Sequence, residues 1–590
     1  MKQFFGAFFG SIVGLIVAVL LVVLIVAVVV RTSINSIKDN REEITLVKPN
    51  SIIRVTLDGR MNEREKENPF RELGENIFPG DNDALGLNAM LKKVRAAKSD
   101  NNVKGIFLHV KKLEAGFAKL SELRAALAEF RDAGKFIYAY SEDYSHREYY
   151  LASVANKVYL NPEGNIDWNG LSMNLVFFKQ AIQKLGIDVQ VFRHGKFKSA
   201  IEPFLLDKMS EANRLQTESF LNSIWTTMLT DIAASRKMSV DELNRMANEL
   251  VIRQPSDAVG KLVDAVLYED EVISRLKEAV SLKAEEKLKF VELGKYNHNE
   301  DKLKAGVSRL AVIYATGAIS GGEGTDEEIG SERISRTIRE ARLDDKIKAI
   351  VLRVNSPGGS ALASDVIWRE VMLAKRVKPV VVSMGDLAAS GGYYISCAAG
   401  RIFAEPNTIT GSIGVFGLLP NFQKMLEDKL GITLDTVNTN LYSDLGSAVR
   451  PVTQKEFEFI QGSVEKVYDT FTKKVAEGRG MTQAQVDSVG QGRVWSGSEA
   501  LKIGLVDELG GLDKAVAYAA KQASLKEYRI VELPKQKGPF DALFDKHEGE
   551  MESRFLQSRL GPAYVYFRYA GDILRMRGVQ ARLPFELLVE

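Results

Sequence analysis

The sequence predicts a tandem pair of α/β domains behind an amino-terminal transmembrane segment. The chain has 590 residues, which is too many for one hydrophobic core. An apolar, uncharged run occupies residues 4–30, and the hydrophobic pattern of one half of the chain returns in the other half. Stretches typical of strands and helices alternate within each half, as in domains built on a largely parallel sheet.

The amino-terminal run at 4–30 is rich in Val, Leu, Ile and Phe. About 20 apolar residues suffice to cross a bilayer, and no small-residue cleavage site follows the run. We therefore expect a retained anchor at 1–31 and a polar tether at 32–50. The basic residues that follow the run are Arg31, Lys38 and Arg41. Only Lys2 precedes it, so this charge pattern alone predicts a cytoplasmic carboxyl side.

The repeat is clearest where VKGIFLHV at 103–110 matches IKAIVLRV at 347–354, an offset of 244 residues. Strand patterns at 51–59 and 309–317 open the two halves. The charged stretch 283–306 lacks clear periodicity and is typical of a linker. We expect the following units: an amino-terminal α/β repeat at 51–282, a carboxyl-terminal α/β repeat at 307–530, and a tail at 531–590.

The second repeat contains two glycine-rich turns. Its expected strands are 347–354, 379–384 and 401–405, and its expected helices are 361–375 and 390–399. NSPGGS at 355–360 directly follows a strand, and Ser390 in AASGG opens a helix. Backbone N–H groups from two such turns, beside a serine hydroxyl, are what an oxyanion hole needs. At the 244-residue offset Gly358, Gly359 and Ser390 become Glu114, Ala115 and His146. A nucleophile would therefore belong to the second repeat.

A base for Ser390 is not evident nearby. The five histidines are scattered: His109, His146, His194, His298 and His547. The stretch RHGKFKSAIEPF at 193–204 offers Lys198, which lies opposite Gly446 when Ser199-Ala200 is aligned with Ser447-Ala448. A lysine acts as a base only when neutral, and burial favours that form. The alternatives are that Lys198 is a solvated loop residue, or that Lys196 is the base.

Other classes of function find little support. The net charge of +2 gives no electrostatic reason to expect a nucleic-acid partner. Cys397 is the single cysteine, so no intrachain disulfide can form, and we expect it in the hydrophobic core. No cysteines and histidines occur at the spacings of a zinc site. SVEK at 463–466 fits SxxK but lies in a helical stretch without SDN or KTG, and Ala388 replaces the first glycine of GxSxG. We expect no metal and no cofactor.

Taken together, these motifs resemble the signal peptide peptidase A family of S49-type serine proteases in its long bacterial form. They are NSPGGS, MGDLAASGGYY at 384–394, TGSIGVFG at 410–417 and GKFKSAIEPF at 195–204, and the resemblance covers about residues 1–530. It implies tandem Clp protease/crotonase-like domains and a Ser–Lys dyad. Ser390 would be the nucleophile, Lys198 the general base, and Ser412 a hydrogen-bond partner of the lysine. Gly391, with Gly358 or Gly359, would form the oxyanion hole.

The same resemblance implies a cellular setting. The protein would cross the bacterial inner membrane once, with its catalytic domains in the periplasm, contrary to the charge pattern. It would form a homo-oligomer, a tetramer in this family, and degrade signal peptides left in the membrane and other apolar peptides. The competing hypotheses are an acyl-CoA enzyme of crotonase type and a non-catalytic scaffold.

Overall fold

The computed structural model describes residues 47–65, 86–296, 307–536 and 578–583, together with Gly14, Leu21 and Arg559. The expected transmembrane segment lies outside the described residues, apart from two single positions. Within the part of the chain that is described, no helix is both long enough and apolar enough to cross a membrane.

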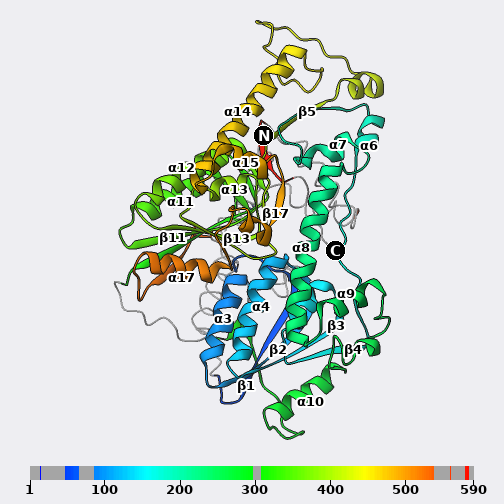
Figure 1. Ribbon diagram of the computed structural model, residues 1–590, viewed down its shortest axis with the longest axis vertical. Helices are drawn as coiled ribbons and strands as arrows, with labels where there is room; N and C mark the ends of the chain where they lie inside the picture. The colour runs from blue at the N-terminus through cyan, green and yellow to red at the C-terminus, as the bar shows by residue number, and fades with distance from the viewer. Residues whose placement is uncertain are drawn as a thin grey trace, which may run out of the picture.

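The first half is built on a six-stranded sheet in the order β6-β4-β3-β2-β1-β7, in which all neighbouring strands are parallel. Its strands are β1 (Ser51–Arg60), β2 (Val103–Glu114), β3 (Phe136–Tyr144), β4 (Lys157–Ile166), β6 (Ala265–Val266) and β7 (Phe290–Glu292). Its main helices are α3 (Leu87–Ser99), α4 (Phe117–Asp132), α5 (His146–Ala152), α8 (Glu211–Arg236), α9 (Val240–Asn248) and α10 (Glu269–Ala279). This half occupies the lower part of Figure 1. The alternation of strand and helix confirms the α/β prediction for this half.

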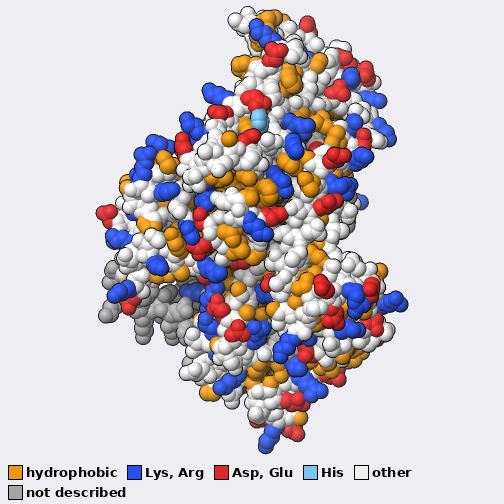
Figure 2. All heavy atoms as spheres, in the orientation of Figure 1, with side chains coloured by type: hydrophobic (Ala, Val, Ile, Leu, Met, Phe, Trp, Pro, Cys, Tyr) orange, Lys and Arg blue, Asp and Glu red, His pale blue; other side chains and the backbone are white. Residues whose placement is uncertain are grey.

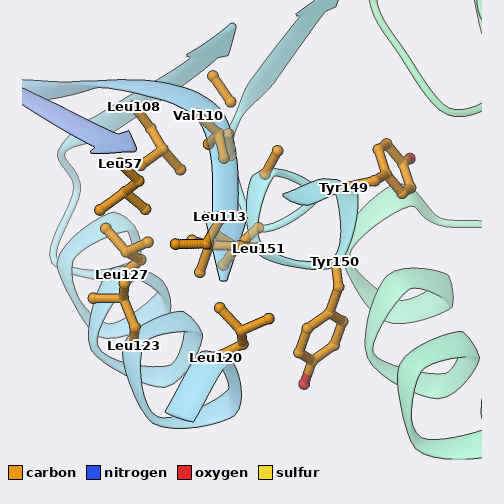
Figure 3. Packing of buried hydrophobic residues seen from close by; sticks show 14 of the residues in the cluster. Leu57, Leu108, Val110, Leu113, Leu120, Leu123, Leu127, Tyr149, Tyr150 and Leu151 are labelled. Atoms are coloured by element: carbon orange, nitrogen blue, oxygen red, sulfur yellow. The ribbon is translucent and has the colours of Figure 1, made fainter. Parts of the chain in front are cut away.

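The central strand β2 explains the continuous apolar pattern. Every residue from Gly105 to Val110 is buried, because helices cover both faces of the sheet. On one face Leu108 packs in a cluster with Leu123 and Leu127 of α4 (Figure 3). On the other face Phe107 packs in a cluster with Val272 and Leu276 of α10.

The second half repeats this plan around a sheet in the order β17-β15-β13-β11-β8-β19, in which β14 also pairs with β13, and β18 pairs with β14. Its strands are β8 (Arg309–Thr316), β11 (Ile347–Ser356), β13 (Val380–Ala389), β14 (Arg401–Ala404), β15 (Ile409–Gly411), β17 (Val494–Ser496), β18 (Glu508–Leu509) and β19 (Arg529–Leu533). Its main helices are α11 (Ser331–Leu343), α12 (Ala361–Lys375), α13 (Gly391–Ser396), α14 (Gln454–Arg479), α15 (Gln483–Val489), α16 (Gly497–Lys502) and α17 (Leu512–Gln522).

Two elements of the second half differ in length from the prediction. Strand β13 continues to Ala389 rather than ending at 384, because it changes neighbours along its length. Residues 381–383 pair with β14, and residues 387–389 pair with β15. Helix α13 is correspondingly shorter than the expected 390–399. The extension of β13 brings Ser390 to the edge of the sheet.

A third sheet joins the two halves and part of the tail, in the order β10-β9-β12-β20-β16-β5. Its strands are β5 (Asp188–Arg193), β9 (Ala318–Ser320), β10 (Glu328–Gly330), β12 (Gly358–Ser360), β16 (Phe416–Asn421) and β20 (Gln580–Arg582). Strand β5 comes from the first half and pairs antiparallel with β16 of the second half along its whole length. Figure 1 shows β5, α6 (Lys179–Lys184) and α7 (Glu202–Leu205) near α14 and the upper end of α8, away from the sheet of the first half.

A buried ion-pair cluster fixes the two halves against each other. The fully buried guanidinium of Arg353 in β11 lies 2.9 Å from Glu63 and 2.5 Å from Glu122, both in the first half. Glu63 also accepts a hydrogen bond at 2.8 Å from Asn355, the first residue of the NSPGGS loop. Breaking a buried ion pair of this kind would leave an uncompensated buried charge, so the contact between the halves resists separation. The hydrogen bond from Asn355 to Glu63 ties the NSPGGS loop to this contact.

The expected domain boundaries remain predictions. Strand β7 lies within the stretch expected to be a linker, yet it pairs with β1 at the edge of the first sheet. Strand β19 crosses the expected start of the tail at 531 and pairs with β8.

Candidate active site

Ser390 lies at the point where β13 ends and α13 begins. Its backbone has φ 55° and ψ −112°, a region that costs a residue with a Cβ atom of order 1–3 kcal/mol. The Ser390 N–H donates a hydrogen bond to the Gly411 carbonyl at 2.8 Å. The following turn has no room for side chains, because a Cβ on Gly392 would lie 2.8 Å from the Ser356 carbonyl oxygen. The surrounding structure therefore holds Ser390 in a strained, fixed position.

Ser412 follows the neighbouring strand in the same way. Strands β13 and β15 run parallel and pair Ala389 with Gly411, so Ser390 and Ser412 leave the same sheet edge next to each other. Ser412 also has a left-handed backbone, with φ 49°. Its N–H donates to the Arg493 carbonyl at 2.7 Å.

Lys198 arrives from the first half on the segment that follows β5. This segment turns at Gly195, with φ 94°, and the Phe197 N–H donates to the Gln491 carbonyl at 2.9 Å. The next glycine of that loop, Gly492, lies so close that a Cβ on it would be 2.7 Å from the Lys198 backbone nitrogen. The loop 490–493 of the second half thus covers the lysine.

The three side chains meet in the buried interior. Lys198 Nζ lies 2.8 Å from Ser390 Oγ, 3.0 Å from Ser412 Oγ and 3.3 Å from the Ser412 carbonyl oxygen. All three residues are fully buried. Burial alone lowers the pKa of the Lys198 amine well below its usual value, because a buried charge loses its hydration. A neutral amine has two N–H donors for the two Ser412 oxygens and one lone pair for the Ser390 hydroxyl.

The alternatives for the base do not come together with Ser390. Lys196 is exposed, with its ammonium group 5.2 Å from the centre of the Phe197 ring. His146, the counterpart of Ser390 in the first half, packs against Trp168 and Trp225. Aromatic packing thus fills the place that corresponds to the serine site.

Of the two glycines considered for the oxyanion hole, Gly358 lies beside Gly391. A Cβ on Gly358 would be 2.7 Å from the Gly391 nitrogen, whereas a Cβ on Gly359 would meet the Ile319 backbone of β9 at 2.1 Å. Gly391 is the first residue of α13, where no preceding helical turn supplies an acceptor for its N–H. This N–H can therefore donate a hydrogen bond to an oxygen atom from outside the helix.

A strand from the carboxyl-terminal tail, β20, lies next to Gly358 and Gly391. Strand β20 runs antiparallel to β12, pairing Ala581 with Gly359, and it also touches β16 at Phe416. Ala581 is fully buried, and its carbonyl oxygen lies 2.1 Å and 3.0 Å from the Cβ positions that Gly358 and Gly391 lack. A peptide backbone thus occupies the space next to both glycines. The sequence left the role of the tail open, since nothing in GVQARL at 578–583 indicates this placement.

Sequence reasoning missed two residues that shape the site. Ser390 Oγ lies 3.3 Å from the Gly414 carbonyl, to which it can donate. The TGSIG motif could have indicated Gly414. Gln216 in α8 contacts both neighbours of Lys198. In the sequence it is an ordinary glutamine within a long helix, and no local pattern marks it.

The buried cysteine matches its expected role. Cys397 is buried, and burial raises the pKa of its thiol to about 12. SVEK lies within α14, as its helical pattern predicts. Neither feature belongs to the Ser390 site.

Comparison with known proteins supplies the family. The model of peptidase family S49 matches the chain twice, at residues 129–283 and 372–526, which confirms the tandem duplication. Protease 4 of Salmonella typhi is 38% identical over 497 residues, covering 82% of this chain and 79% of that protein. Protease 4 of Haemophilus influenzae is 35% identical over 452 residues, covering 74% and 73%.

Two further proteins align with this chain. The chloroplastic serine protease SPPA of Arabidopsis thaliana is 33% identical over 498 residues, covering 82% of this chain and 72% of that protein. The solved structure of the ClpP1 N165D mutant from Listeria monocytogenes aligns at 19% identity over 35% of this chain and 94% of that chain, with a TM-score of 0.24. From the family match and the relatives that span most of its length, the chain belongs to peptidase family S49 and is a serine protease.

Proposed function

We propose that the chain is a membrane-anchored serine endopeptidase that works through a dyad of Ser390 and Lys198. The observation that carries this proposal is the 2.8 Å separation of Lys198 Nζ and Ser390 Oγ in a fully buried site. Membership of a serine protease family favours this function over an acyl-CoA enzyme or a scaffold.

Acylation and deacylation each move one proton twice. The neutral Lys198 amine takes the Ser390 hydroxyl proton while Oγ attacks the carbonyl carbon of the scissile peptide bond. The lysine ammonium then donates that proton to the leaving amine as the C–N bond breaks. In deacylation the neutral lysine accepts a proton from water while the water oxygen attacks the acyl carbonyl carbon. The lysine ammonium then returns that proton to Ser390 Oγ as the bond between Oγ and the acyl carbon breaks.

Ser412 and the glycines complete this proposal. Ser412 Oγ, 3.0 Å from Lys198 Nζ, would accept a lysine N–H and leave the lone pair directed at Ser390. The Gly391 N–H, with Gly358 beside it, would stabilise the oxyanion. Preorganised donors of this kind contribute strongly because they need no reorganisation during the reaction.

The substrate is an extended peptide in this proposal. Strand β20 supports it, because a peptide backbone fits between β12 and β16 and reaches the glycines next to Ser390. Adding a strand to an exposed sheet edge is a common way to bind peptides. The physiological substrates would be signal peptides left in the membrane after preprotein cleavage, together with other apolar peptides. The run at 4–30 would anchor the chain in the bacterial inner membrane, with both repeats in the periplasm.

A homo-oligomer is supported by an unpartnered arm of the second repeat. Residues 427–443 are all exposed, including Val437 at 97% and Leu441 at 78%. The arm extends at the top of Figures 1 and 2, and hydrophobic side chains reach the surface there. Strand β5 pairs with the second half of its own chain. Its counterpart in the arm lies within residues 432–441, since the offset between the repeats is 244 residues at β2 and 248 residues at Ser199-Ala200.

The repeat indicates what would cover this arm. The first-half counterpart of β16, residues 172–177, is not a regular strand in the structure. We propose that a strand within 432–441 of one copy pairs with 172–177 of the next, a head-to-tail contact that closes into a ring such as a tetramer. Light scattering on the detergent-solubilised chain should give a multiple of the chain mass. A Val437→Asp/Leu441→Asp variant should give the single-chain mass, whereas the exposed Val377→Asp control should not. An unchanged mass in the arm variant would contradict this contact.

The catalytic proposal is tested by hydrolysis of a fluorogenic apolar peptide by the detergent-solubilised protein. Ser390→Ala and Lys198→Met should lose nearly all activity with folding intact, and Lys196→Met should keep it. Full activity in Lys198→Met would mean that another group is the base. For the substrate class, a signal peptide reconstituted in lipid vesicles should be cleaved by the wild type and not by Ser390→Ala. If the wild type cleaves the soluble peptide but leaves the signal peptide in the vesicles intact, the assignment of signal peptides as substrates is contradicted. The catalytic proposal is not contradicted by that result.

A further inference from the structure

Gln216 connects the lysine segment of the first half to the serine half. It lies in α8 and is fully buried. Its Nε2 donates to the Phe197 carbonyl at 3.2 Å and to Ser199 Oγ at 2.9 Å. These two acceptors are the residues immediately before and after Lys198. Gln216 therefore holds the lysine segment from both sides.

The other end of the same amide reaches across the boundary between the halves. Gln216 Oε1 accepts a hydrogen bond at 3.1 Å from the N–H of Val494, the first residue of β17. Val494 pairs with Gly411 of β15, and Ser412 follows Gly411 directly. One glutamine thus links the residues on both sides of Lys198 to the strand pair that positions Ser412.

The hydrogen bonds fix the orientation of this amide. The carbonyl acceptor at Phe197 requires the NH₂ group, and the backbone donor at Val494 requires the oxygen. A third acceptor, Asn213 Oδ1, lies 3.1 Å from Nε2 on the same helix. A methionine here would fill the space but lose these hydrogen bonds, whereas an alanine would lose them and also leave a gap.

The seal around Lys198 depends on the strand that Gln216 holds. Gly492 lies two residues before Val494, and it contacts the Lys198 backbone so closely that a Cβ on it would clash at 2.7 Å. If the bond to Val494 is lost, the loop 490–493 can separate from the lysine segment. Water that enters such a gap would stabilise the lysine ammonium and reduce the neutral fraction.

We propose that Gln216 is a positioning residue, which keeps Lys198 sealed against Ser390 by joining the two repeats. This inference rests on the proposed role of Lys198 as the general base. Gln216 would touch neither the substrate nor the reacting atoms, and it would act through Phe197, Ser199 and Val494.

Several other titratable groups lie around the lysine segment. On the elements packed against it they are Glu202, Glu465, Tyr468, Asp487 and Arg493, and on the segment itself His194 and Lys196. Glu202 is held by Ser210 and Asn213, Glu465 by His194, and Asp487 by Tyr468. Arg493 lies over the Phe197 ring at 5.2 Å. None of these groups contributes to the lowered pKa of Lys198, which comes from burial. The pH dependence should therefore report the seal itself.

The test is the pH profile of kcat/KM for a fluorogenic peptide, measured on wild type, Gln216→Ala, Gln216→Met and the exposed control Gln522→Ala. Gln216→Ala should lose about tenfold in kcat/KM at pH 7, mainly in kcat, and should recover toward the wild-type value as the pH rises. Its acid limb should lie at higher pH than that of wild type. Gln216→Met fills a similar volume, adds no charge near Lys198 and should show the same shift, which keeps the test valid if the alanine variant does not fold. Gln522→Ala should match the wild type.

Two results would overturn the inference. One is an acid limb that stays at the wild-type pH in both Gln216 variants. The other is a loss that is equal at every pH, as a purely structural defect would give. Lys198→Met separates this failure from that of the proposed function. If Lys198→Met is inactive while the Gln216 variants keep the wild-type profile, only the role of Gln216 is wrong.

Discussion

Lys198 and Ser390 are 192 residues apart in the sequence, yet their Nζ and Oγ atoms lie 2.8 Å apart. The lysine belongs to the first repeat and the serine to the second, and β5 carries the lysine segment across by pairing with β16. A single chain therefore brings the pair together. The proposed site is therefore divided between the repeats, since each supplies a residue that the other lacks.

The pH dependence of activity follows from the lowered pKa of Lys198. In the proposed mechanism Lys198 acts as a neutral base, so activity is present above the lysine pKa of the folded protein and is lost as the pH falls through it. We expect substantial kcat/KM at pH values well below the ordinary lysine pKa, with a single acid limb. Lys196→Met should leave that limb in place. A profile that rises only near the ordinary lysine pKa would contradict a buried, neutral amine.

Ser412 should affect kcat more than KM. Ser412→Ala removes the oxygen 3.0 Å from Lys198 Nζ and leaves only the carbonyl contact at 3.3 Å. One orienting hydrogen bond of this kind is worth about 1–2 kcal/mol, so kcat should fall roughly fivefold to thirtyfold. Steady-state kinetics should be compared with the exposed control Ser443→Ala. A change confined to KM would contradict an orienting role.

Gly358 should be intolerant of a side chain for reasons of space. In Gly358→Ala the new methyl group would lie 2.7 Å from the Gly391 nitrogen at a backbone φ of 94°. We expect kcat to fall at least a hundredfold, as for loss of one oxyanion donor. Gly134→Ala is a matched control, since its φ is 85° and nothing lies within 4 Å of the added atom. Equal losses in both variants would assign the effect to backbone strain alone.

The tail strand should compete with peptide substrates. Strand β20 lies against β12 next to Gly358, and Leu583 is buried in the core. A tethered segment acts at an effective concentration in the millimolar range, so a chain that ends at residue 577 should show a KM lower by on the order of tenfold. A chain that ends at residue 583 keeps β20 and serves as the control. Equal KM values in the two truncations would contradict competition by the strand.

Local patterns in the sequence were sufficient to predict most of the second repeat. Helix α12 has the predicted bounds, and the strand at 347–354 lies within β11, because buried parallel strands and capped helices leave strong periodic signals. The extension of β13 to Ala389 was not predicted. That extension depends on pairing with β15, which is a tertiary contact.

The site was predictable only in part for the same reason. Ser390 and the glycine turns stand out locally, since small residues cluster around them. The pairing of β5 with β16, the contact of Gln216 with Val494 and the place of β20 each join segments far apart in the chain. No local pattern encodes such contacts, and without the family resemblance Lys198 would have been one loop lysine among several.

The most direct test of the divided dyad is the rate at which a fluorophosphonate probe acylates Ser390, which requires no knowledge of the substrate. Wild type and Lys196→Met should be labelled at equal rates, with the label found on Ser390. Lys198→Met, checked for intact folding, should be labelled about 10²–10⁴ times more slowly, because the serine has lost its base. Labelling of Lys198→Met at the wild-type rate would contradict the account.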